Sequence, residues 1–313
     1  MSNGGVTVYT GAGLGAYHFG DAHAWNSNRY QAFWHSLCAQ GLQHKVRLHE
    51  ANTARRTDIT RFHTEAHLSR LEEKAAEGVG YFDGGDTPVR ADILEATRCV
   101  IGAGLDAARW ILDASITGAS PKTFRKAFIP IGGLHHAGRE QVAGFCVLSD
   151  IGVVIEYLRA QGVQRIAYID IDVHHGDGVY YAYENDPHLF VVDIHEDGRY
   201  LYPGTGAANE VGIGFARHSK CNLPLPPYAE DEAFLAAWQQ GLAFLQQHPV
   251  DFILLQCGAD ALAGDPLAHL RCSPAAWAQL TRDVRALAHA QGHGRVLAWG
   301  GGGANIDSIA AAW

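Results

Sequence analysis

From Lys126 to the end of the chain, short apolar runs alternate with longer segments in which apolar residues recur every three or four positions. The runs have the length and composition of strands, and the longer segments have the period of amphipathic helices. The alternation predicts βαβ units and therefore a parallel sheet. The predicted strands cover residues 127–132, 165–171, 189–194, 251–257 and 295–299.

The segments between these runs carry signals for helix starts. Ser149 and Asp150 can cap one helix, Glu230 and Asp231 open a second, and Ser273 with Pro274 opens a third. The predicted helices cover residues 149–158, 230–245 and 273–290.

In the first 125 residues the boundaries between elements are less clear, and the hydrophobic pattern is helical. It predicts helices over 27–42 and 92–112, with a turn-rich loop at 80–88. No internal repeat or long linker divides the chain. We therefore expect one doubly wound α/β domain spanning residues 1–313.

Composition narrows the classes of function. The chain has 24 Lys and Arg against 33 Asp and Glu, a net charge of −9, and no basic run, which argues against nucleic-acid and anionic-membrane binding. The six cysteines form no CxxC pair, and the N-terminal segment lacks the order of a signal peptide. No apolar run approaches the ~18 residues of a membrane span. These features predict a soluble, cytoplasmic protein. The chain is also unusually rich in histidine, with 18 residues.

The densest cluster of polar residues, 168–178, contains Asp170, Asp172 and His174 at intervals of two. An extended chain points such residues to one face. Asp260 follows another predicted strand and would reach the same edge of the sheet. Asp172, His174 and Asp260 would form a three-ligand site with a free position for water, as in catalytic zinc sites. Iron, cobalt and manganese remain open.

A glycine-rich loop after the first predicted strand of this region carries His135 and His136. Neither is needed as a ligand, so both can move protons. Asp170 and Asp177 remain to orient them. Two His–Asp pairs beside a metal site are typical of a hydrolase.

With these segments, the chain resembles the histone deacetylase superfamily, and bacterial acetoin-utilisation deacetylases most closely. The motifs that carry the resemblance are GGLHHA, GFCVLSD, YIDIDVHHGDGV, HEDGRYLYPGTG, NLPLPP and GADALAGDPLA. It implies an arginase/deacetylase-like three-layer α/β/α fold with a central mostly parallel sheet. It also implies Zn²⁺, with Fe²⁺ or Co²⁺ as alternatives, on Asp172, His174 and Asp260 at the bottom of a narrow tube.

The resemblance further implies an amidohydrolase that uses a metal-bound water, with His135 and His136 as the base and acid pair, backed by Asp170 and Asp177. The substrate would be an acylated lysine peptide or a small acylated amine; a homo-oligomer stays open. Structural K⁺ would bind carbonyls of Asp170, Asp172, His174 and Ile194, although Asp193 replaces the expected hydroxyl residue. The expected substrate-binding residues are Asp86, Gly144, Phe145, Tyr202, Leu267 and Gly302.

One position departs from the family pattern. The glycine run at 300–303 is followed by Ala304, where relatives have a tyrosine that stabilises the oxyanion. Losing one such donor typically costs on the order of 10²–10³ in rate. Tyr228 could supply the hydroxyl, or the enzyme could act on unusual acyl groups without it. The chain could also be a weak acyl-binding homologue or an engineered inactive variant.

An arginase-type manganese ureohydrolase is the rival on the same fold. It would need additional bridging aspartates for two metal ions. The second position after His174 is Gly176, and the 256–266 segment supplies one well-placed ligand, so the sequence argues against this alternative.

Overall fold

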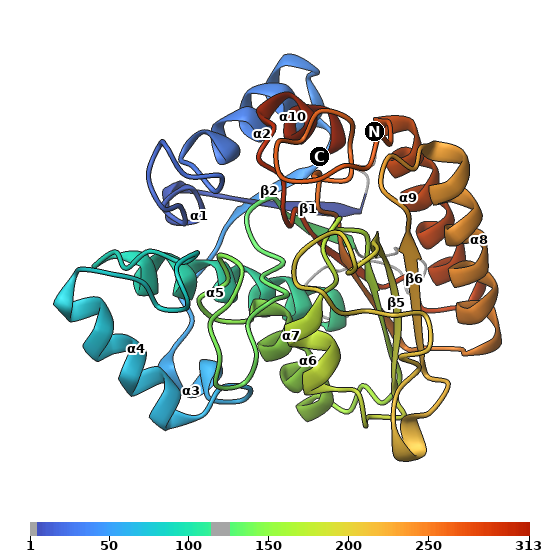
Figure 1. The fold of residues 1–313 in the computed structure, drawn as a ribbon, viewed down its shortest axis with the longest axis horizontal. Helices are drawn as coiled ribbons and strands as arrows, with labels where there is room; N and C mark the ends of the chain where they lie inside the picture. Colours follow the sequence, from blue (N-terminus) through green and yellow to red (C-terminus); the bar gives the residue numbers. More distant parts are fainter. Residues whose placement is uncertain (1–4, 114–125) are drawn as a thin grey trace.

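The computed structural model describes residues 5–113 and 126–313, and these residues build one parallel sheet between layers of helices (Figure 1). The sheet has the strand order β2-β1-β3-β8-β7-β4-β5-β6, and every pair of neighbours is parallel. The strands are β1 Val6–Thr10, β2 Arg47–Glu50, β3 Lys126–Ile129, β4 Ile166–Asp170, β5 Leu189–Glu196, β6 Lys220–Leu225, β7 Phe252–Gln256 and β8 Val296–Trp299.

The helices differ greatly in length. The longer ones are α2 Asn28–Ala39, α4 Glu65–Glu77, α5 Ile93–Leu112, α6 Asp150–Ala160, α8 Asp231–Gln247 and α9 Pro274–Ala290. The short ones are α1 Ala12–Gly15, α3 Arg56–Ile59, α7 Asp177–Ala182 and α10 Ile306–Ala312, with 3-10 turns η1 Leu42–His44 and η2 Gly214–Ala216. No helix in the two described ranges is long and apolar enough to cross a membrane.

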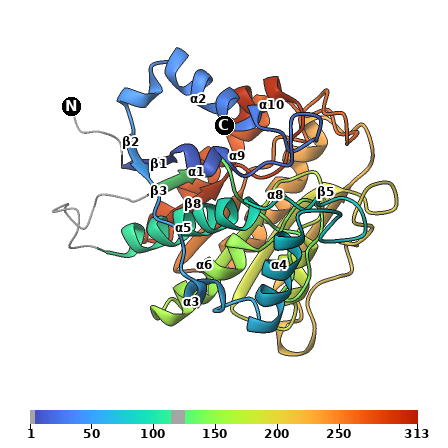
Figure 2. The same ribbon diagram turned by 90° about the vertical axis from the view of Figure 1, so that its left-hand side faces the viewer.

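The core lies on both faces of the sheet because successive strand residues point in opposite directions. In β4, Ile166 and Tyr168 pack in the cluster that contains α5 and α6, whereas Ala167 and Ile169 pack in the one that contains α8 and α9. Near β1, a smaller cluster joins α2 and α10. Figure 2, viewed from the side of α4, shows the same layers. The expected three-layer α/β fold is therefore confirmed.

The strands and helices predicted after Lys126 are confirmed with small shifts at their ends. The helical interpretation of the first 125 residues is wrong in part, because β1 and β2 also lie there. The sequence of β2, RLHE, has one apolar residue and no apolar run, because this edge strand is largely exposed. Strand β6 was not predicted either.

Four neighbouring strands, β3, β8, β7 and β4, place their following loops at one edge of the sheet. Parallel strands have all their carboxyl ends on the same side, where open α/β sheets hold ligands. These loops carry His135 and His136 after β3, Ala304 after β8, Asp260 after β7 and the Asp172–His174 segment after β4.

Candidate metal centre

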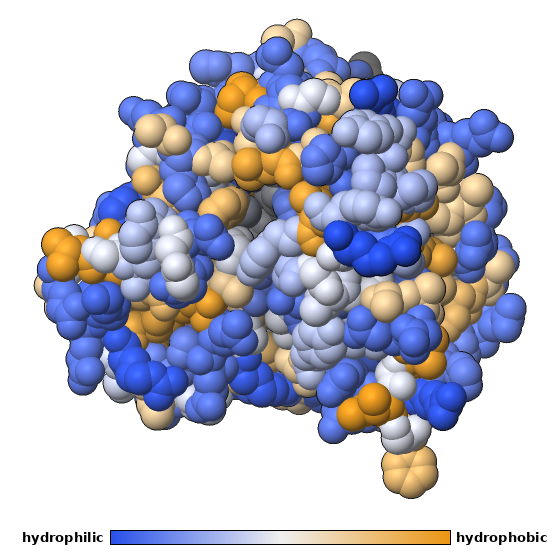
Figure 3. All heavy atoms as spheres, in the orientation of Figure 1, coloured by the Kyte–Doolittle hydropathy of each residue, from blue (hydrophilic) through white to orange (hydrophobic). Residues whose placement is uncertain are grey.

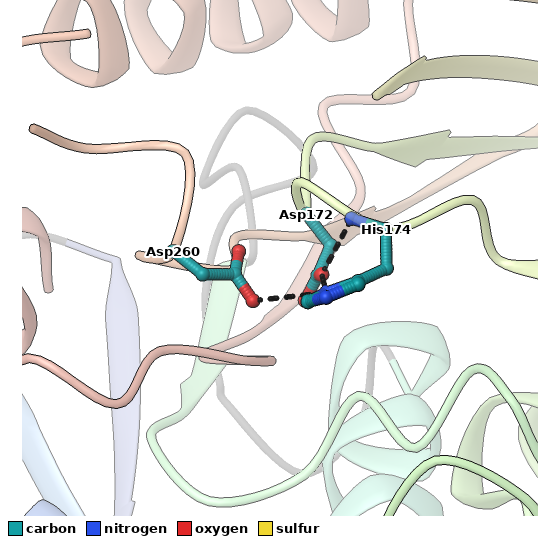
Figure 4. A group of neighbouring side chains, drawn as sticks. All are labelled: Asp172, His174 and Asp260. Atoms are coloured by element: carbon teal, nitrogen blue, oxygen red, sulfur yellow. Dashed lines mark hydrogen bonds and ion pairs between the residues drawn. The ribbon is translucent and has the colours of Figure 1, made fainter. Parts of the chain in front are cut away.

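Asp172, His174 and Asp260 bring one ligand atom each to within 4.8 Å of one another. His174 Nδ1 lies 3.0 Å from Asp172 Oδ1 and 3.4 Å from Asp260 Oδ2 (Figure 4). Asp172 and Asp260 are buried, and His174 is nearly so. One imidazole and two carboxylates form a donor set that suits zinc and related divalent metals. The residues present therefore fit the metal that the sequence predicts.

Neighbouring groups hold these ligands in place. Asp172 Oδ2 accepts hydrogen bonds from Gln256 Nε2 at 2.7 Å and from the Gly302 amide at 2.8 Å, and the Val173 amide donates to Asp260 Oδ1. A Cβ at Gly302 would lie 2.2 Å from Asp260 Oδ2, so only glycine permits this close approach. Such outer contacts orient ligands before the metal arrives.

The metal-free site holds a proton that a metal must displace. Burial opposes the charge on His174, but hydrogen bonds to Asp172 and Asp260 raise the pKa of His174 to about 10. Burial and the charge of Asp172 raise the pKa of Asp260 to about 7. An imidazolium cannot coordinate a metal, so ligation requires that proton to leave.

We therefore expect Zn²⁺ binding to release at least one proton at pH 7.5 and to weaken as the pH falls from 8 to 6. Calorimetric titration in buffers of different ionisation enthalpy measures the proton count. The His174→Ala variant is the control. A binding heat that is the same in every buffer would contradict the expected protonation of His174.

Two His–Asp pairs lie beside these ligands. His135 Nδ1 is 2.8 Å from Asp170 Oδ2, and His136 Nδ1 is 2.6 Å from Asp177 Oδ1. Both imidazoles are buried, and their ring centroids are 4.1 Å apart. The pairing of each histidine with its own aspartate is the one that the sequence and the family resemblance indicate.

The two imidazoles differ in charge. Burial disfavours a charge on His135, but Asp170 and Asp172 outweigh it and raise the pKa of His135 to about 10. Burial, together with the charge of His135, lowers the pKa of His136 to about 4. In the metal-free site at neutral pH, this pair therefore consists of one imidazolium, His135, and one neutral imidazole, His136, and only the neutral ring can accept a proton.

A pocket of about 270 Å³ leads to the metal ligands and both histidines. Figure 3 shows a hollow in the middle of this face of the molecule. All the substrate-binding residues expected from the sequence line the pocket, namely Asp86, Gly144, Phe145, Tyr202, Leu267 and Gly302. Ala304 lines it as well. Tyr202 approaches His136 edge-on, with 5.1 Å between ring centroids.

Tyr228 is not among the residues that line this pocket. Its side chain is 58% exposed, its ring lies under the Arg271 guanidinium at 4.7 Å, and it stands beside His269. Its backbone adopts a left-handed φ of 67°. The structure therefore does not bring this hydroxyl to the place expected for an oxyanion donor.

Asp193, which replaces the hydroxyl residue expected at the K⁺ site, lies in β5. Asp193 Oδ1 is 2.6 Å from His195 Nδ1, and Asp193 Oδ2 accepts from the Gly176 amide at 3.0 Å. Both carboxylate oxygens are thus engaged by protein donors. Structural K⁺ stays a prediction.

Several residues of the site were not predicted from the sequence. Gln256 fixes Asp172, and the buried Asp150 carboxylate accepts the amides of Gly133 and Leu134 just before the histidine pair. Trp25 lines the pocket from a segment far away in sequence. Asp150 had a sequence signal only as a helix cap, and the others had none.

Together, the fold and the site define an α/β protein with a candidate metal centre at the carboxyl edge of its parallel sheet. Comparison with known proteins agrees with this class. The family model of the histone deacetylase domain matches residues 23–313, so the chain belongs to the histone deacetylase domain family.

Individual relatives support the assignment. The chain is 35% identical to the acetoin utilization protein AcuC of Bacillus subtilis over 80% of its length and 64% of that protein's. It is 29% identical to the histone deacetylase RPD3 of Saccharomyces cerevisiae over 98% of its length and 70% of that protein's. The crystal structure of the HDA15 HD domain has a TM-score of 0.86 at 24% identity, covering 99% of this chain and 87% of that one, and shows the fold. The chain thus spans less than two thirds of the AcuC proteins it matches.

Proposed function

We propose that the chain is a zinc-dependent deacylase that hydrolyses the amide of an acylated lysine side chain or of a small acylated amine. The observation that carries the proposal is the convergence of three N/O ligands and two His–Asp pairs in one pocket. The chain's membership of the histone deacetylase domain family, and relatives named as deacetylases, point to an acyl amide as the substrate.

Zn²⁺ held by Asp172, His174 and Asp260 would supply Lewis acidity for the acyl carbonyl and a lowered pKa for a water molecule. His136, neutral because its pKa is lowered, accepts the proton of the attacking water and then returns it to the departing amine. His136 Nδ1 faces Asp177, so Nε2 is the atom that handles this proton. His135, paired with Asp170 and standing beside His136, would donate a hydrogen bond to the substrate oxygen as that oxygen becomes negative.

The walls of the pocket suit an extended chain. Phe145 has a left-handed φ of 67° and is held by two contacts: its amide donates to Thr87 Oγ1, and its carbonyl accepts from the Tyr17 hydroxyl at 2.6 Å. With Tyr202 it supplies aromatic wall area. At the rim, the exposed carboxylate of Asp86 can accept amide protons of a bound peptide.

A weak acyl-binding homologue is the second candidate function, and Ala304 favours it. If the usual tyrosine is the missing element, Ala304→Tyr should raise kcat by on the order of 10²-fold, because it adds one oxyanion donor. The assay is turnover of acetyl-lysine and trifluoroacetyl-lysine peptides by protein of known zinc content.

Tyr228→Phe is the matched control, since it removes a hydroxyl outside the pocket and should leave kcat unchanged. Turnover by the native chain would support the deacylase. Turnover by Ala304→Tyr alone would support the acyl-binding homologue, and absence of turnover from both zinc-loaded proteins would contradict the deacylase proposal.

A further inference from the structure

A half-buried imidazole in the loop before α2 contacts two residues of the pocket from outside it. His23 Nε2 lies 3.2 Å from the carbonyl oxygen of Asp86, which is 63 residues away in sequence. The His23 ring also meets the Phe145 ring edge-on, with 4.6 Å between their centroids. Asp86 and Phe145 line the pocket, whereas His23 does not. His23 therefore joins the rim of the pocket to its aromatic wall.

The hydrogen bonds of His23 fix its tautomer. The Trp25 amide donates to His23 Nδ1 at 2.9 Å, so Nδ1 is the acceptor and the proton of the ring is on Nε2. Nε2–H is thus the donor to the Asp86 carbonyl. The Phe19 ring packs against the same imidazole, with 5.0 Å between centroids. Ring contacts and hydrogen bonds together hold this donor in one orientation.

The turn that carries Asp86 is built around one side chain of its own. Asp83 Oδ1 accepts the amides of residues 85–87 at 2.9–3.0 Å. Two glycines lie just before Asp86 and add backbone freedom. Among the described residues, His23 is the only one outside this turn that forms a hydrogen bond with Asp86. The position of the rim carboxylate therefore depends on His23.

The Phe145 ring gives His23 a fixed surface to pack on. The Phe145 amide donates to Thr87 Oγ1, and the Phe145 carbonyl accepts from the Tyr17 hydroxyl. These bonds do not involve His23, so the aromatic wall keeps its place when the imidazole is lost. Loss of His23 should therefore act on the rim and spare the tube below it.

We propose that His23 is a positioning residue, which holds the Asp86 carboxylate at the rim where the backbone of an acyl-lysine peptide binds. Asp86 is exposed and lines the pocket, so its carboxylate can accept backbone amide protons of a bound peptide. Within the described chain, His23 has no hydrogen bond or ring contact with the metal ligands or with the pair His135 and His136. It therefore acts on the affinity for peptide and not on the chemical step. The inference rests on the proposed deacylase function and favours an acylated lysine in a peptide over a small acylated amine as the substrate.

His23→Asn removes the contact with Asp86 but keeps the local turn. Asparagine can accept the amide of the residue two positions on, here Trp25, but its side chain ends before the position of Nε2. In zinc-loaded protein, we expect KM for an acetyl-lysine peptide to rise on the order of tenfold, as for loss of one hydrogen bond to a charged group. The value of kcat should stay within about twofold of that of the native protein.

Two comparisons separate positioning from a general structural effect. N-Butylacetamide has the acetyl-lysine side chain without a peptide backbone, so its kcat/KM should stay within about twofold in His23→Asn. Asp86→Ala alone should raise the peptide KM at least as much as His23→Asn does. Combining the two substitutions should add nothing further, because the imidazole then has no carboxylate to position.

His18→Asn is the matched control. His18 Nδ1 accepts the Gly20 amide at 3.1 Å in the same way as His23 accepts its own turn amide. In the part of the chain that the structure describes, no hydrogen bond or ring contact joins His18 to Asp86 or Phe145. Both substrates should therefore keep their native constants in this variant.

The possible outcomes separate this role from the deacylase itself. A native peptide KM in His23→Asn, equal losses for the two substrates, or additive losses in the double variant would overturn the role of His23. Turnover of N-butylacetamide by a native chain that does not bind the peptide would overturn it as well, while supporting the deacylase. If the native chain binds the peptide without turnover, a calorimetric Kd weaker by about tenfold in His23→Asn would support the role and contradict the deacylase. A native chain that neither binds the peptide nor turns over either substrate would overturn both.

Discussion

Replacing His174 by alanine is expected to abolish stoichiometric zinc binding and to lower turnover beyond detection. His174 contributes the nitrogen ligand among three, and its loss leaves the buried carboxylates of Asp172 and Asp260 facing each other without a cation. Changing an outer contact of a metal site typically costs about 10–100-fold, so loss of a direct ligand should exceed that range. Elemental analysis after gel filtration and turnover of an acetyl-lysine peptide measure the two effects.

The matched control is His188→Ala, which removes an exposed imidazole outside the pocket and should leave zinc content and turnover at native values. One zinc per chain together with native turnover in His174→Ala would show that the metal centre lies elsewhere. The circular dichroism spectrum of His174→Ala should match that of the native protein, because the sheet core does not depend on this side chain.

The metal centre could be predicted from the sequence because each ligand directly follows a buried strand. The apolar runs that become β4 and β7 end just before Asp172 and Asp260, and parallel strands deliver both to one edge. The same positions predict that His135 and His136 lie near Asp170 and Asp177, whereas the pairing of each histidine with its own aspartate came from the family resemblance. Short motifs at strand ends carry most of the site's geometry.

Other features of the structure could not be predicted, because the local sequence carries no sign of them. Strand β2 is recognisable only from its pairing with β1, because its exposed side chains have no apolar pattern. Trp25 resembles an ordinary core tryptophan in sequence, and its place in the lining of the pocket depends on how distant segments pack in the fold. Tyr228 was expected to supply the missing hydroxyl, but it adopts a left-handed backbone conformation and its ring lies against Arg271.

The two histidines of the pair have similar sequence surroundings but opposite protonation. His135 lies between the carboxylates of Asp170 and Asp172, whereas His136 is paired with Asp177 alone and faces the charge of His135. Two titratable groups whose pKa values are driven apart in this way can divide the work of holding charge and accepting a proton. The division gives the two residues different expected phenotypes.

His136→Ala is expected to lower kcat by about 10³-fold, near the middle of the range for loss of a general base. Zinc content should stay at one per chain, because His136 is not a ligand of the Asp172–His174–Asp260 centre. KM should change little, since the aromatic walls of the tube remain. Steady-state kinetics on an acetyl-lysine peptide, with elemental analysis of the same preparations, measure these quantities.

His135→Ala is the comparison that makes the assignment sharp. It removes one hydrogen-bond donor to the substrate oxygen but leaves the neutral imidazole of His136, so we expect a loss of about 10²-fold, smaller than that of His136→Ala. With the charge of His135 gone, the pKa of His136 should rise, and the acidic limb of the kcat profile should move to higher pH. A larger loss from His135→Ala than from His136→Ala would show that the roles are reversed, because the residue that accepts the proton cannot be the one whose removal costs less.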